Sequence, residues 1–168
     1  LTRSSAASDV YKRQENNIMC FNVKKNNNKW NWLAEIKSIP DDKCISPKQI
    51  NITIATRSNG AGHPIYIHIP RIKTPIPIFI VFRALGIISD KEICKYIILN
   101  IADNDMKKML FALKASIVEA QKYNTQELAL DYIVRQAMFT PINMTPEEGK
   151  KKQQEFTENV LNLSLIHI

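Results

Sequence analysis

The sequence predicts an α+β fold: a small antiparallel sheet of about three strands, followed by about five helices packed as a partial helical domain. Three runs in the first half alternate apolar and polar residues, which is the period of half-buried strands. In the second half, apolar residues recur every three or four positions behind capping residues, as in amphipathic helices. Between the two halves lies the apolar stretch Pro75–Gly86, which we expect at the centre of the domain.

The three alternating runs predict strands at Trp30–Ser38, Gln49–Arg57 and Ile65–Ile69. Period two places Trp30 and Trp32 on one face, so both are expected to pack in the core, with base stacking as the alternative. The apolar run Ile18–Val23 is a further strand candidate. The loop Ser58–His63 contains two glycines but no phosphate-binding motif, so it is interpreted as a hairpin connection.

The stretch Pro75–Gly86 is apolar on every face except at Arg83, its one charged residue. A short buried strand would give the same pattern. A helix is favoured because Pro77 suits a first helical turn and Gly86 suits the position just past a helix end. A buried charge is costly unless it is paired, so we expect Arg83 to meet a carboxylate or a helix-end carbonyl. A nucleic-acid contact is the alternative for this arginine.

Four more helices are expected after Gly86. Capping-box spacing begins at Ser89, at Asn124 and at Thr145, where a hydroxyl or amide precedes a glutamate by three residues. Asp103 or Asn104 is expected to cap the remaining helix. That helix carries a methionine-rich apolar face, which we interpret as core, the alternative being an adaptable binding groove.

The net charge of +7 is compatible with an acidic partner such as nucleic acid but does not define one. The candidate DNA-contact residues are basic positions expected to be exposed on helices: Lys107, Lys108, Lys150, Lys151 and Lys152. For each of them, a solvated helix face is the alternative interpretation.

No catalytic residue and no metal site is predicted. The three cysteines and three histidines lack the paired spacing of a zinc site, and His68 is interpreted as a surface histidine. Sparse, unpaired cysteines indicate a reducing compartment. No apolar run reaches the roughly 18 residues that span a bilayer, so no membrane association is expected. Residues 1–14 and 163–168 look like translated adapter sequence and are set aside from fold reasoning.

The segment Ile76–Ile93 (IPIFIVFRALGIISDKEI) resembles part of the second-largest, β-type subunit of multisubunit DNA-directed RNA polymerases. The likeness is to the eukaryotic, archaeal and large-DNA-virus type. Its motif residues are Pro77, Phe82, Arg83, Ala84, Leu85 and Gly86. Weaker matches appear in family order at Ala34–Ser38, Ile69–Lys73, Glu127–Arg135 and Lys152–Asn162.

The resemblance implies the lobe domain (domain 2) of that subunit at residues 29–162, incomplete at its C-terminus. Residues 15–28 would be the end of the preceding protrusion domain. In the family, the lobe shapes the DNA cleft and docks initiation factors without catalytic residues of its own. The whole enzyme is a nucleotidyltransferase that uses Mg²⁺ at an active site carried mainly by the largest subunit. No cofactor is therefore expected in this fragment.

The partners that the resemblance implies are the other polymerase subunits, mainly the largest, together with transcription initiation factors and the DNA template through non-specific contacts. The expected location is the nucleus for a cellular enzyme, or a cytoplasmic viral factory or virion for a viral one. From the residues alone, a free-standing helical protein–protein interaction module is the alternative function.

Overall fold

The structure, a computed structural model, describes residues 18–23, 28–38, 48–99, 103–138 and 145–165. One antiparallel sheet has the sequential strand order β1-β2-β3-β4-β5. Its strands are β1 (Met19–Asn22), β2 (Trp30–Ser38), β3 (Lys48–Ala55), β4 (Ile65–His68) and β5 (Ile76–Pro77). The helices that follow are α2 (Ile78–Ala84), α3 (Asp90–Ile98), α4 (Asn104–Ala120), α5 (Gln126–Gln136) and α6 (Pro146–Leu165).

The α+β fold class and the five helices are confirmed, whereas the described sheet has five strands where about three were predicted. The three predicted strands are β2, β3 and β4. The additions are β1, the candidate at Ile18–Val23, and β5, whose two residues pair with β4. Pro77 therefore ends a strand and precedes α2 as its N-cap, with an extended ψ of 134°, instead of lying in the first helical turn as predicted.

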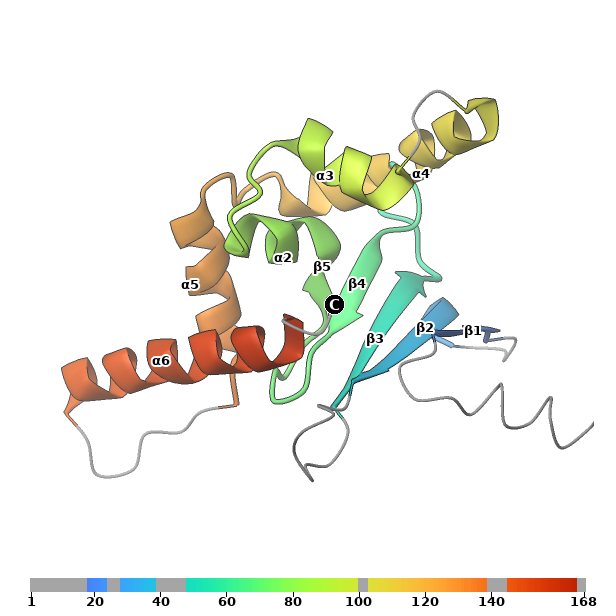
Figure 1. Cartoon of the computed structure of the whole chain (residues 1–168). Coiled ribbons are helices and arrows are strands. Elements are labelled where there is room, and N and C mark those ends of the chain that lie inside the picture. Colours follow the sequence, from blue (N-terminus) through green and yellow to red (C-terminus); the bar gives the residue numbers. More distant parts are fainter. Residues whose placement is uncertain (1–17, 24–27, 39–47, 100–102, 139–144, 166–168) are drawn as a thin grey trace, which may run out of the picture.

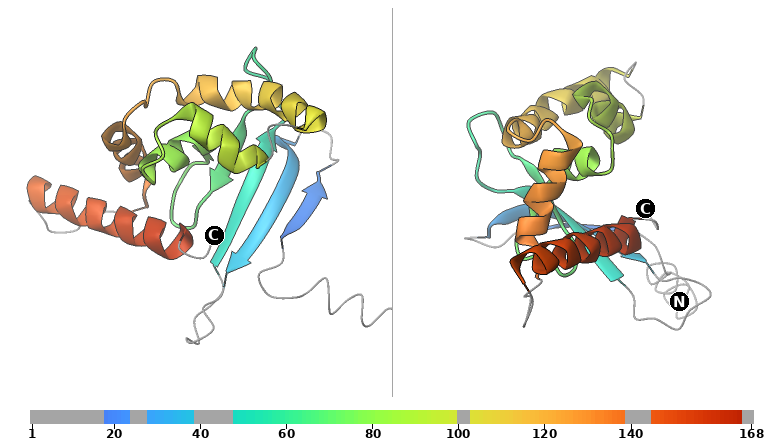
Figure 2. Two further views of the ribbon diagram at one scale, coloured as in Figure 1. Left: turned by 45° about the horizontal axis from the view of Figure 1, so that its top comes forward. Right: turned by 90° about the vertical axis from the view of Figure 1, so that its left-hand side faces the viewer.

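Helices α2, α3 and α4 lie over the end of the sheet formed by β4 and β5, and β1 and β2 lie at the opposite end (Figures 1 and 2). Strand β1 pairs antiparallel with β2, with Met19 opposite Glu35. It belongs to the same sheet as β2, although it falls within residues 15–28. The predicted division between a protrusion segment and a lobe stays a prediction, as do the adapter-like ends.

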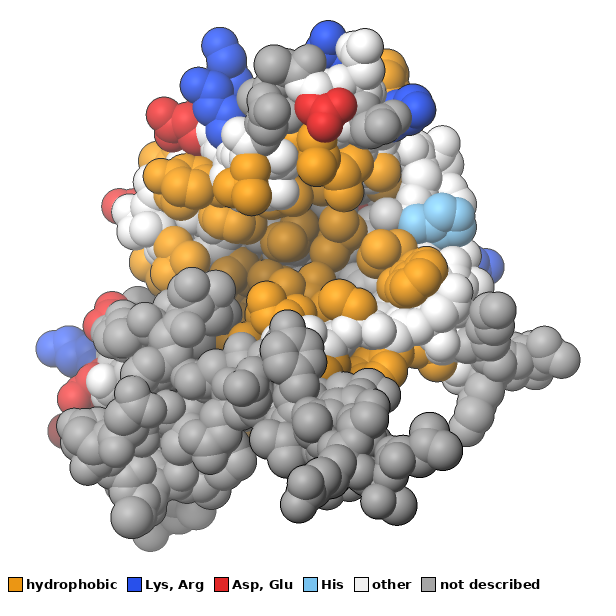
Figure 3. Space-filling view, turned by 45° about the vertical axis from the view of Figure 1, so that its right-hand side comes forward, with side chains coloured by type: hydrophobic (Ala, Val, Ile, Leu, Met, Phe, Trp, Pro, Cys, Tyr) orange, Lys and Arg blue, Asp and Glu red, His pale blue; other side chains and the backbone are white. Residues whose placement is uncertain are grey.

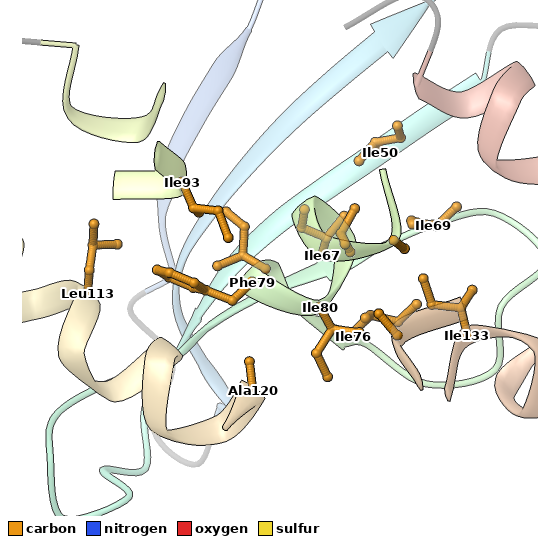
Figure 4. Close-up of a cluster of buried hydrophobic side chains, with 14 of the residues drawn as sticks. Ile50, Ile67, Ile69, Ile76, Phe79, Ile80, Ile93, Leu113, Ala120 and Ile133 are labelled. Atoms are coloured by element: carbon orange, nitrogen blue, oxygen red, sulfur yellow. The ribbon is translucent and has the colours of Figure 1, made fainter. Parts of the chain in front are cut away.

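The hydrophobic core is centred on α2, which confirms that Pro75–Gly86 is buried in the middle of the domain. Phe79 of α2 is fully buried and lies among Ile93 of α3, Leu113 of α4 and Ala120 (Figure 4). On the other side, Ile80 packs near Ile133 of α5. Each such side chain contributes roughly 1.5–3 kcal/mol relative to an exposed one. The short helix is therefore held by its surroundings on all sides.

A break in the register of β2 separates the two tryptophans. Trp30 lies opposite Ala55 and Trp32 lies opposite Ile54, so two residues of β2 advance while β3 advances by one. This bulge turns Trp30 to the face that carries Thr53, where its ring meets Tyr66 edge-on at 5.6 Å. Trp32 stays on the other face and is 48% exposed. The prediction that both tryptophans share one core-facing side is wrong, because strict alternation does not anticipate a bulge.

The loop Ser58–His63 joins β3 to β4 as the predicted hairpin connection and is tied to α4. The side-chain amide Nδ2 of Asn59 donates to the Ala115 carbonyl and to the Glu119 carboxylate, both at 3.0 Å. Gly62 has a φ of +140°, and a Cβ there would lie 3.4 Å from the Ala115 side chain. Glycine thus allows the loop backbone to lie close against the helix.

Candidate functional site

Arg83 is the most elaborately bonded side chain in the described core. It is 3% exposed, and its Nη1 donates to the carbonyls of Ala120 at 2.6 Å and Tyr123 at 2.9 Å. Its Nη2 forms an ion pair with the Asp90 carboxylate at 2.5 Å. The arginine therefore joins the C-terminal end of α4 to the first turn of α3, where helix carbonyls and a carboxylate are both available. The predicted pairing with a carboxylate or helix-end carbonyl is confirmed.

The other residues of the family-like motif support this junction. Gly86 has a φ of +98°, as expected just past a helix end, and its amide donates to the Arg83 carbonyl at 3.0 Å. The Ala84 carbonyl accepts a hydrogen bond from the Gln126 side chain at 3.1 Å. Phe82 is half-buried against the core, whereas Leu85 is 47% exposed at the helix end. Arg83 and its motif neighbours thus connect α2, α3, α4 and α5.

A second junction forms around Ile69–Lys73, another family-like stretch. The Lys73 amide donates to the Gln136 carbonyl at 2.8 Å, and the Met138 amide donates to the Arg71 carbonyl at 2.9 Å. The Arg71 guanidinium lies 5.8 Å from the centre of the Phe156 ring of α6, a cation–π distance. This stretch therefore ties the segment after β4 to both α5 and α6.

The candidate DNA-contact lysines fall into two separate groups. Lys107 and Lys108 are exposed at the start of α4, and Lys150, Lys151 and Lys152 are exposed near the start of α6. The two helix starts lie on opposite sides of the molecule (Figures 1 and 2). The structure therefore does not bring the five lysines together into one basic surface.

The lysine triplet of α6 lies among exposed carboxylates of the same helix, which are Glu147, Glu148, Glu155 and Glu158. The helix begins with the predicted capping box: Thr145 Oγ donates to the Glu148 carboxylate at 2.8 Å, and the Glu148 amide donates back to Thr145 Oγ at 3.4 Å. The hydrogen bonds from Thr145 lower the pKa of Glu148, with Lys152 adding a smaller effect in the same direction. The start of α6 therefore presents charges of both signs.

The other two capping predictions differ in detail. Thr125, one residue later than the predicted Asn124, is the N-cap of α5 and accepts from the Leu128 amide at 3.3 Å. Ser89 is the N-cap of α3, but its side chain makes no capping hydrogen bond. The helix starts were therefore predicted to within a residue, and the hydroxyl bond of Ser89 was not found.

His68 lies in a polar cluster on the face of the sheet that carries Trp30. Its Nε2 is 3.0 Å from the hydroxyl of Thr53, and its ring meets Trp30 edge-on at 5.1 Å. Thr53 is 2% exposed. Burial, and secondarily the charge of Lys29, lowers the pKa of His68. The predicted surface histidine is therefore a half-buried residue that keeps Thr53 bonded.

Two hollows in the surface offer little chemistry. A groove of about 360 Å³ has a mostly apolar lining, formed by Asn31, Trp32, Ile54, Gly62, His63, Ile65 and Ala112. Figure 3 shows that hydrophobic side chains gather on one face of the molecule. Another hollow, of about 390 Å³, contains Tyr123 and Tyr132, whose rings lie 4.7 Å apart. Burial raises the pKa of Tyr132, with neighbouring Tyr123 and Glu119 adding to it. The one carboxylate lining this hollow, Glu119, accepts the Asn59 hydrogen bond described above.

Within the described ranges, no three His, Cys, Asp or Glu side chains are grouped so that they could hold a metal ion. None of the helices in that part of the chain has the length and apolar character to cross a membrane.

Sequence reasoning missed one surface, the outer stripe of α4 around Phe111. The signal was available as spacing, because Lys107, Phe111, Lys114 and Val118 recur every three or four residues beside the methionine-rich face.

These contacts define a class of protein before any comparison: an α+β domain whose most densely bonded residues hold its helices and sheet together. The family described as RNA polymerase Rpb2, domain 2, matches residues 14–168, and the chain belongs to that family. The matched range includes every described element.

Individual relatives agree with this assignment. DNA-directed RNA polymerase II subunit 2 of Arabidopsis thaliana is 28% identical over 159 residues, which cover 92% of this chain and 12% of the relative. DNA-directed RNA polymerase II subunit RPB2 of Encephalitozoon cuniculi is 36% identical over 117 residues, which cover 70% of this chain and 9% of the relative. The subunit of that name from Schizosaccharomyces pombe is 31% identical over 137 residues, which cover 80% of this chain and 10% of the relative. The chain thus spans about a tenth of the length of these curated relatives.

Proposed function

We propose that the chain acts in DNA-templated transcription as the lobe domain of the second-largest subunit of a DNA-directed RNA polymerase. The observation that carries this proposal is the family match across residues 14–168. The structure supports it in one respect: two of the segments that resemble the family, Ile76–Ile93 and Ile69–Lys73, contain residues that hold helices of the domain together. The alternative of a free-standing interaction module is not favoured by the family match.

The role proposed for this domain is architectural. It shapes one side of the DNA cleft and offers a docking face for factors, while nucleotidyl transfer takes place elsewhere in the enzyme. The Mg²⁺ used for that reaction would be held mainly by the largest subunit, where metal ions stabilise the attacking and leaving oxygens. The direct partners would be the other polymerase subunits, mainly the largest, and transcription initiation factors. The relatives named above are eukaryotic, which favours the nucleus over a viral factory or virion.

The experiment for this proposal is affinity purification of the tagged native protein from its source cells. The expected result is co-purification with a largest polymerase subunit and with Mg²⁺-dependent RNA synthesis on nicked DNA. A mock purification from untagged cells is the control. Recovery of the protein without polymerase subunits and without RNA synthesis would contradict the assignment.

Non-specific DNA contact by the candidate lysines is a further part of the proposal. Each phosphate contact that is lost lowers the slope of log affinity against log salt by about 1. In the assembled enzyme, we expect Lys107→Glu with Lys108→Glu, and likewise a triple charge reversal of Lys150, Lys151 and Lys152, to reduce the slope, because each variant removes exposed positive charges. Lys95→Glu on α3 is the matched control, and an unchanged slope in both multiple variants would remove the DNA-contact assignment.

A further inference from the structure

The outward side of α4 carries a stripe of alternating lysines and apolar residues. Its members are three to four residues apart and are all exposed: Lys107, Phe111, Lys114, Val118 and, two residues past the helix, Lys122. Phe111 is 79% exposed and Val118 is 45% exposed. Spacing of this kind places side chains above one another on one helix face. A phenylalanine ring therefore stands between two lysines on the outer surface.

A shallow groove runs along this stripe. It encloses about 530 Å³ and is lined by Lys107, Leu110, Phe111, Lys114 and Ile117. Leu110 and Ile117 are half-buried against the core, so they form a floor that does not move freely. The groove thus has an apolar floor, one exposed ring as a wall and ammonium groups at its rim.

Both charged side chains that line the groove, Lys107 and Lys114, are positive. Lys107 donates to the Asn104 side chain at 3.2 Å, a neutral partner, so its positive charge is retained. The carboxylate of Glu119 is bonded to Asn59 and lines the neighbouring hollow, together with Val118 and Lys122 of the stripe. A partner that fits this surface must offer acidic groups for the rim and an apolar side chain for the floor. The lysines and the apolar floor together therefore favour a partner that is both acidic and apolar.

We propose that the α4 stripe docks an acidic protein segment that inserts an aromatic or aliphatic side chain against Phe111, Leu110 and Ile117. The proposal rests on the proposed function, in which this domain binds factors, and it assigns the residues and the chemistry of one docking surface. Nucleic acid, for which Lys107 is a candidate contact residue under the proposed function, is the competing occupant of the stripe. Duplex phosphates would use the lysines but would leave the Phe111 ring in water, whereas an apolar anchor buries it.

The test uses the 168-residue chain, labelled with ¹⁵N, and NMR titration. The probe is a short synthetic peptide of Asp and Glu residues that contains one Phe and one Leu. Two comparison probes are the same peptide with both apolar residues replaced by Ser, and oligothymidine. The expected result is that amide shifts concentrate at residues 107–122 with the first peptide and are weak with the Ser peptide.

Variants separate the anchor from the charge. Phe111→Ser and Lys114→Glu should each lower the affinity for the first peptide by at least about five-fold, because a buried aromatic anchor and a neighbouring charge dominate such contacts. The matched controls are Tyr96→Ser and Lys95→Glu on α3, where Tyr96 is 63% exposed, and these should change affinity by less than about two-fold. Circular dichroism confirms that each variant is folded.

Three results would overturn the proposal: no shifts with the first peptide at millimolar concentration, equal binding of the Ser peptide, or equal losses in the α3 controls. Tighter binding of oligothymidine, weakened by Lys114→Glu and not by Phe111→Ser, would assign the stripe to nucleic acid instead. The test needs no other polymerase subunit. Its failure would leave the co-purification result standing, and failure of co-purification would leave the peptide result standing.

Discussion

Replacing Arg83 by methionine tests whether the guanidinium holds the helices together. Methionine matches the aliphatic length of arginine but cannot donate hydrogen bonds. In Arg83→Met, the carbonyls of Ala120 and Tyr123 lose their charged donor at the end of α4. Ala120 is fully buried, so water does not easily replace the donor there. The junction of α2 with α3 and α4 is expected to weaken as a unit.

The magnitude follows from the exposure of each partner. A buried acceptor left without a hydrogen bond costs about 1–3 kcal/mol. The arginine serves two carbonyls, and that of Ala120 still accepts from the Tyr123 amide at 3.0 Å when the arginine is removed. The side chain of Asp90 is 42% exposed, so its carboxylate regains water and its share of the ion pair is at most about 1 kcal/mol. Losing the cost of burying a charge offsets part of the total. We therefore expect Arg83→Met to lower the free energy of unfolding by about 2 kcal/mol.

The assay is urea denaturation of the chain followed by far-ultraviolet circular dichroism, with Asp90→Asn as the matched control. The control should cost at most about 1 kcal/mol. Arg83→Lys should lose nearly as much as Arg83→Met, because a single ammonium cannot reach two carbonyls and a carboxylate in fork geometry. Equal destabilisation by Asp90→Asn and Arg83→Met would refute the reasoning, since the ion pair and not the helix end would then dominate. So would a loss below about 0.5 kcal/mol in Arg83→Met.

Three further predictions follow from the sheet and from α6. Trp30→Ala should lower the free energy of unfolding, measured by urea denaturation, by about 2 kcal/mol, and Trp32→Ala should lower it by less than half as much. In single-tryptophan variants, iodide should quench the fluorescence of Trp32 more than that of Trp30. The reverse order in either experiment would contradict the bulge. His68 has a folded pKa below its ordinary 6.5, so its neutral form stabilises the fold fully above that value, and this contribution should be lost as pH falls from 6.5 through the folded pKa. Urea midpoints across that window should fall less in His68→Gln, and identical profiles would exclude His68 as a source. Glu148 has a pKa below its ordinary 4.5, so its cap supports the start of α6 above that value and loses this role as pH falls through the folded pKa. Amide exchange at residues 147–149 should be faster in Glu148→Ala than in the wild type at neutral pH, with no difference once wild-type Glu148 is protonated. A difference that persists at that pH would point to another cause.

The sequence was sufficient for features that depend on local pattern. The alternation of Ile50, Ile52 and Ile54 predicted β3, and the Thr145 capping box predicted the start of α6 within one residue. The need to pair a buried charge predicted the partners of Arg83. In each case the physical cause acts within a few residues of the chain, or through a general cost that any fold must meet.

Features that depend on how distant segments meet were not predictable in this way. The β2 bulge depends on how Ala55 and Ile54 of β3 are presented, so period two in β2 alone put Trp30 on the wrong face. The strand β5 exists because β4 lies beside it, since two residues carry no alternating pattern. The half-burial of His68 follows from the ring of Trp30 above it, a contact created by the same bulge.

The part of the chain that identifies the family and the part proposed to bind a partner obey different physical constraints. A substitution in α2 changes contacts with the sheet and with α3, α4 and α5 at once, because the helix is buried on nearly all sides. A substitution of Phe111 changes one exposed ring and leaves the core face of α4 intact. The fold can therefore stay constant while the outer stripe acquires a different charge or anchor. Membership of the family consequently cannot specify the partner of this surface, and that specificity has to be measured on the stripe of α4 itself.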